Sequence, residues 1–194
     1  MIPDVLITSR NRAGSVLMST SPGKGYDVRN VISIGEVGSP PPTGLRRHTR
    51  RVIRLEYDDV EYESPRFSYR GTTWEDTANL VKFCRKIATD QSKTLVHCAQ
   101  GIRRSTASAT VLFAVCLGPG GEDIAVECLL RARDWTIAQG ARATADVFIQ
   151  PNRRVVYMAD LMLGLGGALL NAVEARPEFK YRDVFDRTTV AYPG

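Results

Sequence analysis

The sequence is poor in histidine and lacks the cysteine spacings of a metal site. Its 194 residues include two histidines, His48 and His97, and four cysteines. Because no spacing matches a zinc pattern, we expect neither a metal nor another cofactor. We expect free thiols, and three of them fall in helical patterns typical of small core residues. These three are Cys84, Cys116 and Cys128.

Long apolar runs and targeting segments are also missing. The longest apolar stretch, 155–173, is interrupted by Asp160, Asn171 and three glycines. It is therefore predicted to be packed helix rather than a membrane span. The first residues do not show the charged-then-apolar order of a secretion signal. Together these absences predict a cytoplasmic protein without a transmembrane segment.

The remaining composition is that of a globular protein, with 43% hydrophobic and 24% charged residues. We expect one domain over residues 1–194, with the polar segment 178–194 as a mobile C-terminal tail. The net charge of +5 favours anionic partners. A charge of this size does not by itself indicate nucleic acid, and we expect no specific binding to it.

One stretch, 94–105, combines three features. The apolar run Thr94–Cys98 predicts a buried strand that ends in His97-Cys98. Five residues follow, with Gly101 in the middle, where it allows a tight turn. An Ala- and Val-rich helical pattern then begins at Arg104-Ser105. The sequence therefore predicts a strand, a tight loop and a helix N-terminus in direct succession.

This arrangement suits the binding of an anion. Backbone N–H groups of a tight loop and the positive end of a helix attract negative charge. Arg104 can add a fork that matches phosphate geometry. The same field favours the thiolate of Cys98, which is the nucleophilic form. The hydroxyl of Ser105 could hydrogen-bond the sulfur.

His97-Cys98, five residues and Arg104-Ser105 together resemble the signature loop of cysteine-dependent protein tyrosine phosphatases. Gly101 and Ser105 fit the dual-specificity branch. The resemblance implies an α/β fold, with a central, mostly parallel or mixed sheet of about four to five strands flanked by helices. It implies a phosphorylated protein or another phosphomonoester as substrate. It also implies phosphate binding by the loop residues Ala99, Gln100, Gly101, Ile102, Arg103 and Arg104.

The resemblance also implies a general acid after a strand that precedes the loop. The alternating segment 52–57 predicts such a strand, and Asp59 follows it at the expected position, with Asp58 as the near alternative. A purely structural reading is that both aspartates end the strand and cap a turn.

Three further residues carry roles implied by the resemblance. His97 is expected to orient the loop and tune the thiolate. Pro151-Asn152 before a helix resembles a second feature of the branch, in which the Asn braces the active-site loops, although helix capping explains it equally well. Arg103 stands where the family usually has a small residue. It either favours a more highly charged substrate, such as a phosphoinositide or a polyphosphorylated end, or points into solvent.

Periodicity and turn residues predict the remaining elements. Further strands are expected at 5–8 and 28–34, and helices at 105–117, 122–133, 152–163 and 167–174. Thr72 and Glu75 form a capping box for the helix before the central strand. Loops are expected at 9–24, at the proline-rich 39–44 and over most of 134–149. The basic cluster 45–51 is either a solvated loop or a positive rim that attracts phosphorylated partners.

These features favour an active phosphatase of dual-specificity type. Two other classes compete with it. One is a phosphate-binding module that keeps the loop but lacks a working acid, and the other is a redox or sulfur-transfer enzyme that uses Cys98. The second class needs a partner cysteine, and none lies in the loop or beside it in sequence. A phosphoinositide or RNA-end phosphatase of the same superfamily is a further alternative.

Overall fold

The computed structural model describes residues 2–19, 28–45, 50–62, 68–138 and 149–190. Its centre is a four-stranded sheet in which every neighbouring pair is parallel. The spatial order of the strands is β1-β4-β2-β3. Their bounds are Val5–Ser9 for β1, Val28–Gly35 for β2, Arg51–Glu56 for β3 and Lys93–Cys98 for β4. The expected α/β class with a mostly parallel sheet of about four to five strands is confirmed.

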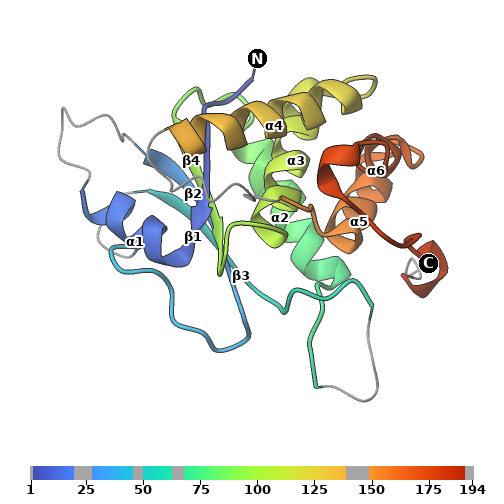
Figure 1. Cartoon of the computed structure of the whole chain (residues 1–194). Helices are drawn as coiled ribbons and strands as arrows, with labels where there is room; N and C mark the ends of the chain where they lie inside the picture. The colour runs from blue at the N-terminus through green and yellow to red at the C-terminus, as the bar shows by residue number, and fades with distance from the viewer. Residues whose placement is uncertain (1, 20–27, 46–49, 63–67, 139–148, 191–194) are drawn as a thin grey trace.

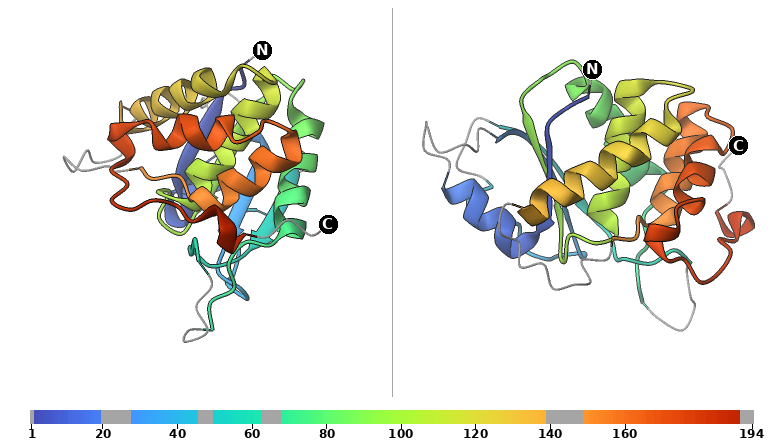
Figure 2. Two further views of the ribbon diagram at one scale, coloured as in Figure 1. Left: turned by 90° about the vertical axis from the view of Figure 1, so that its right-hand side faces the viewer. Right: turned by 45° about the horizontal axis from the view of Figure 1, so that its top comes forward.

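Helices cover both faces of this sheet, as Figure 1 shows. Helix α1 lies on one face, α2, α3 and α4 pack on the other, and α5 and α6 pack on the outer side of these three helices (Figure 2). The bounds are Arg10–Met18 for α1, Trp74–Ile87 for α2, Arg104–Leu117 for α3, Glu122–Ala138 for α4, Arg153–Leu163 for α5 and Ala168–Glu174 for α6. Two short 3-10 helices, Pro177–Phe179 and Arg187–Thr189, follow.

The sheet buries apolar side chains on both faces, as parallel sheets do. Alternate residues of one strand belong to different clusters: Leu95 packs toward α1, whereas Val96 packs toward the larger helical layer. Helix α3 runs through the middle of that layer, and all of its residues from Arg104 to Ala114 are buried. The N-terminus of α3 is therefore fixed by packing along most of the helix.

Four sequence-based expectations differ from the structure. The segment 9–24, expected as a loop, contains α1, because Ser9 caps it and Ala13, Val16 and Leu17 form a buried stripe. The capping box lies one residue later than expected. It is formed by Thr73 and Asp76 rather than by Thr72 and Glu75. Thr72 is instead buried.

Helix α4 continues to Ala138, beyond the expected end at Arg133. Residues 139–148 of the expected loop, and 46–49 of the basic cluster, lie outside the described residues. Of the same cluster, Arg51 forms an ion pair with Asp90.

The segment expected to form a mobile tail places Phe179, Phe185 and Val190 in the core. Its last residues, 191–194, lie outside the described part. Within the described residues, no helix is both long enough and apolar enough to cross a membrane.

Asp160 offers a test of how α6 is held. Its fully buried carboxylate accepts hydrogen bonds from the N–H groups of Gly167, Leu169 and Leu170, at 2.6, 2.7 and 3.1 Å. We expect Asp160→Ala to lower the free energy of unfolding by about 3 kcal/mol, because buried donors lose their acceptor. Asp160→Asn keeps one acceptor oxygen and should cost less. Urea unfolding of the three proteins measures this, and equal stability of all three would contradict it.

Candidate active site

The carboxyl ends of the four strands meet at one edge of the sheet. The register pairs Ser9 at the end of β1 with Cys98 at the end of β4, and Gly35 of β2 with Glu56 of β3. Clefts at this edge are the usual ligand sites of open parallel sheets. The loop 99–103 leaves β4 here and leads directly into α3. The strand, loop and helix predicted for 94–105 are therefore present in that order.

Cys98 lies at the base of this loop and is 2% exposed. Its Sγ accepts a hydrogen bond from the N–H of Gly101 at 3.2 Å and lies 3.3 Å from the Oγ of Ser105. Both groups can donate to a sulfur that carries negative charge, and hydrogen bonds to the charged form favour that form. Ser105 therefore lies where the sequence pattern suggested, against the sulfur.

The three other cysteines have different surroundings. Cys84 and Cys128 are buried and Cys116 is half-buried, and all three are free thiols. Burial raises the pKa of each of these thiols. They are therefore poor nucleophiles at neutral pH.

The loop is turned tightly by Gly101. Its φ is +81°, a region that side chains rarely adopt. A Cβ at this position would lie 2.7 Å from the carbonyl carbon of Thr8 and 2.9 Å from the nitrogen of Ser9. The loop therefore packs directly on the backbone at the end of β1. There is no room for a side chain at position 101.

The carbonyl groups of the loop are bound to the surrounding frame. Ala99 O accepts from the N–H of Arg10, Ile102 O from that of Gln150, and Arg103 O from that of Asn152, at 3.1 to 3.2 Å. None of the described peptide bonds is cis, so the N–H of each of these peptides points opposite to its carbonyl. The N–H groups of Gln100, Arg103 and Arg104 are thus turned away from the frame, as in an anion cradle.

Arg104 is the first residue of α3, and it is 3% exposed. Its Nη1 donates to the carbonyl oxygen of Tyr57 at 2.7 Å, and its Nη2 donates to Glu36 Oε1 at 2.6 Å. Its buried Nε has no hydrogen-bond partner among the described residues. A buried donor without a partner costs free energy, so this N–H is suited to donate a hydrogen bond to an anionic oxygen.

Glu36 holds Arg104 in place. It follows β2, and its side chain is 45% exposed. The hydrogen bond from Arg104 lowers the pKa of Glu36 below its usual value, which keeps the carboxylate charged. The sequence analysis did not select Glu36, because a lone glutamate after Gly35 has no spacing that relates it to Arg104.

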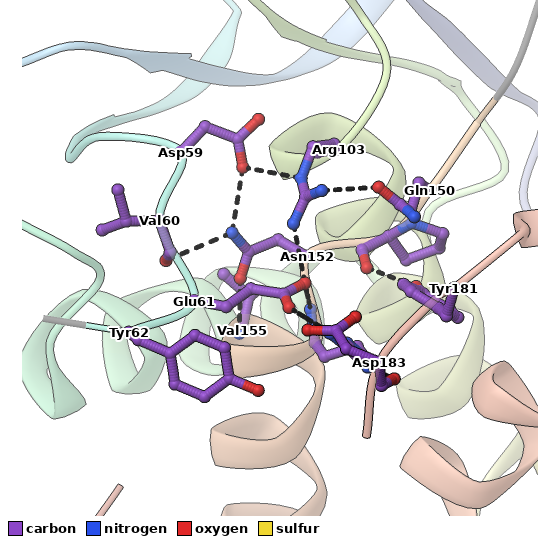
Figure 3. A network of polar contacts seen from close by, with 12 residues as sticks. Asp59, Val60, Glu61, Tyr62, Arg103, Gln150, Asn152, Val155, Tyr181 and Asp183 are labelled. Carbon is purple, nitrogen blue, oxygen red and sulfur yellow. Dashed lines mark hydrogen bonds and ion pairs between the residues drawn. The ribbon is translucent and has the colours of Figure 1, made fainter. Parts of the chain in front are cut away.

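The two candidate acids face different neighbours. The carboxylate of Asp58 accepts from the backbone N–H of Arg70 at 2.9 Å, so it connects the end of β3 to the segment before α2. Oδ1 of Asp59 instead accepts from Asn152 Nδ2 at 2.9 Å and from Arg103 Nε at 3.3 Å (Figure 3). Of the two, only Asp59 is connected to the loop of Cys98 by a hydrogen bond that the described residues make.

Asn152 connects three parts of the site. Its side-chain oxygen caps α5 by accepting from the N–H of Val155, and its Nδ2 donates to Asp59 and to the carbonyl of Val60 (Figure 3). Its backbone N–H donates to Arg103 O. Capping and bracing were alternative readings of the sequence, and the same residue makes both sets of contacts.

His97 is completely buried in β4, and its Nε2 lies 2.8 Å from the Oγ of Ser33 on β2. The same hydroxyl accepts a hydrogen bond from Nη1 of Arg54 at 3.1 Å. Burial lowers the pKa of His97 to about 4, so the ring is neutral at neutral pH. His97 therefore ties β4 to β2 immediately before the nucleophile.

No group of three or more His, Cys, Asp or Glu side chains suited to hold a metal ion occurs in the described part of the chain.

Comparison with known proteins finds similar solved structures but no similar family model. No family model matches this chain, and no curated protein does. Among solved structures, it is similar to a human tyrosine phosphatase-like serine/threonine/tyrosine-interacting protein, with 17% identity over 73% of this chain and 80% of that one, at a TM-score of 0.48. It is also similar to OH1 from the Orf virus, a tyrosine phosphatase with triple substrate specificity. The identity there is 19% over 84% and 88% of the two chains, at a TM-score of 0.44. What this chain does is therefore inferred from its own geometry.

Gly101 provides a test of the loop. Gly118 has a similar φ of +76°, but nothing lies within 4 Å of the place that its Cβ would take, so it is a matched control. Gly118 has a ψ of −179°, and this combination with positive φ is almost exclusive to glycine, so we expect Gly118→Ala to cost about 1–3 kcal/mol of stability from backbone strain alone. Gly101→Ala should cost more and should also abolish binding of vanadate, because the loop must leave β1. Chemical unfolding and vanadate titration measure the two effects, and equal behaviour of the variants would refute the close packing.

His97 predicts a pH dependence of stability. The folded state holds the ring neutral down to about pH 4, whereas the unfolded chain takes up a proton near pH 6.5. Stability from this residue is therefore complete above about pH 6.5 and falls by about 3 kcal/mol as the pH drops to 4. His97→Gln should lose this part of the pH dependence. Unfolding measured from pH 4 to 7 checks it, and identical profiles for the two proteins would contradict it.

Proposed function

We propose that this chain is a phosphomonoesterase of the protein tyrosine and dual-specificity phosphatase type, and that it acts through a cysteinyl-phosphate intermediate. One observation carries the proposal: Cys98 Sγ is next to two donors, Gly101 N–H and Ser105 Oγ, and the loop is followed by Arg104, whose buried Nε has no hydrogen-bond partner among the described residues. A nucleophilic sulfur and an anion cradle thus share one loop. The loop sequence, which resembles that of these phosphatases, supports the same class.

In the first proposed step, a lone pair of the Cys98 thiolate forms a bond to phosphorus while the bond from phosphorus to the ester oxygen breaks. Arg104 and the loop N–H groups bind the non-bridging oxygens, and they bind best in the transition state, where charge spreads over these atoms. Asp59 gives its proton to the departing oxygen.

In the second step, a water oxygen forms a bond to phosphorus and the bond from sulfur to phosphorus breaks. The Asp59 carboxylate, now ionised, takes the proton of this water. Sulfur leaves as the thiolate, and Ser105 and the Gly101 N–H stabilise the charge that returns to it. The cycle consumes one ester and one water and yields one alcohol or phenol and inorganic phosphate.

The placement of the two aspartates favours Asp59 as the acid. Asp59 contacts Arg103 of the loop and Asn152, which braces that loop, whereas Asp58 contacts the backbone of Arg70. Asp58 therefore serves as a matched control, since it has the same side chain one residue away.

Hydrolysis of a small aryl phosphate tests the function. We expect Cys98→Ser to abolish turnover, because an alcohol is a far weaker nucleophile than a thiolate. Asp59→Asn should lower kcat by about 10²–10⁴-fold, the usual contribution of a general acid. Asp58→Asn should change kcat by less than about 5-fold, because the side-chain partner of this carboxylate among the described residues is the backbone N–H of Arg70 and not the loop of Cys98.

The controls decide between the competing classes. Circular dichroism and thermal unfolding of each variant test whether it folds. Activity that persists in Cys98→Ser contradicts the nucleophile. If Asp58→Asn loses the activity and Asp59→Asn retains it, the acid is Asp58. Wild-type protein that binds vanadate but hydrolyses no ester is a phosphate-binding module rather than an enzyme.

A further inference from the structure

A network of alternating charges leads from Asp59 to the C-terminal segment, and its central members Glu61 and Arg153 are buried (Figure 3). Its centre is Glu61, whose side chain is 6% exposed. Oε1 of Glu61 accepts from Nη2 of Arg103 at 2.8 Å and from the backbone N–H of Arg153 at 2.9 Å. Oε2 accepts from Nε and Nη2 of Arg153 at 3.0 and 2.7 Å. One buried carboxylate thus holds two arginines and the first N–H of α5.

Arg103 is fully engaged by this network. Its Nε donates to Asp59, its Nη1 to Gln150 Oε1 at 2.5 Å, and its Nη2 to Glu61. All three nitrogens of its guanidinium therefore have acceptors on the side of the acid and of α5. Its backbone belongs to the loop that follows Cys98, but its side chain is already bound by Asp59, Gln150 and Glu61. The sequence left open a role for Arg103 in binding a more highly charged substrate. These contacts favour a role beside Asp59 instead.

The other end of the network is the C-terminal segment. Arg153 donates from Nη1 to the carbonyl of Asp183 at 2.8 Å and from Nη2 to its carboxylate at 3.0 Å. The rings of Tyr181 and Phe185 lie over its guanidinium, at 4.5 and 5.5 Å from the ring centroids. Residues 181–185 therefore hold Arg153 in one position, which in turn fixes Glu61.

We infer that Glu61 and Arg103 are positioning residues for the general acid Asp59, anchored by the C-terminal segment through Arg153. This inference rests on the proposed function. The acid must reach the departing oxygen within hydrogen-bond distance to act. Asp59 is itself exposed, and its contacts within the described residues are the donors Arg103 and Asn152. Glu61 sets the position of the first donor, and α5 sets that of the second.

The test separates positioning of the acid from a merely structural role. Loss of a general acid slows esters with basic leaving groups, which need the proton, far more than esters with acidic ones. We would measure kcat/KM, which reports formation of the cysteinyl-phosphate, for phenyl phosphate and for dinitrophenyl phosphate. Both substrates place the same phosphate in the same loop.

We expect Glu61→Gln to lower kcat/KM for phenyl phosphate by about 10–100-fold, part of the full contribution of an acid, while dinitrophenyl phosphate changes by less than about 3-fold. Arg103→Gln should show the same selectivity. In an Asp59→Asn background, Glu61→Gln should add almost nothing for phenyl phosphate, because residues that act as one unit are not additive.

Glu127→Gln is the matched control, since Glu127 forms an ion pair with Arg176 at the same 2.8 Å but away from the site. It should leave both rates unchanged. Vanadate affinity and thermal unfolding test whether Glu61→Gln keeps an intact loop and fold.

Several results would overturn the inference. They are an equal loss on both substrates, no loss on either, or full additivity with Asp59→Asn. If Glu61→Gln does not fold, Arg103→Gln gives the same comparison. Wild-type protein that hydrolyses neither ester overturns the proposed function and this inference together. An active wild type without the leaving-group selectivity in the variants overturns the inference alone.

Discussion

The packing of one glycine against the end of β1 constrains the rest of the site. Gly101 turns the loop so closely onto Thr8 and Ser9 that a Cβ has no room, and this brings its N–H to the sulfur of Cys98. The loop carbonyls are then bound by α1 and by the segment before α5. Because α3 is buried along most of its length, the other end of the loop is fixed as well. A cradle bound at both ends and on its outer side needs little reorganisation to hold an anion.

Two consecutive arginines serve different purposes in this arrangement. Arg103 is the N-cap of α3 and Arg104 is its first residue, and their side chains face different neighbours. Arg104 is held by Glu36 and by the carbonyl of Tyr57, and it keeps one buried N–H without a partner among the described residues. Arg103 is bound to acceptors around Asp59. Arg104 thus keeps a donor for the proposed anion, whereas Arg103 contacts the proposed acid Asp59.

The sequence predicts most of the fold and the centre of the site, but several of its local expectations are wrong for physical reasons. The loop predicted at 9–24 contains a helix whose short apolar stripe is hidden among polar and glycine residues. The capping box lies at Thr73 and Asp76, since two adjacent threonines each precede an acidic residue by three positions. Phe179 and Phe185 are core residues within a segment whose average composition is polar, and composition averages conceal isolated aromatic anchors.

By itself, the sequence determined that a strand, a tight loop and a helix follow one another around Cys98, because these features depend on neighbouring residues and on the period of apolar side chains. It also limited the candidates for the proposed general acid to two aspartates. Only the tertiary structure decided which of them faces the loop, and what Arg103 contacts. Glu36, Glu61 and Arg153 join the site from three other parts of the chain. Ion pairs between such distant segments leave no local spacing in a sequence, since they depend on the parallel strand order and on how α5 packs beside α3.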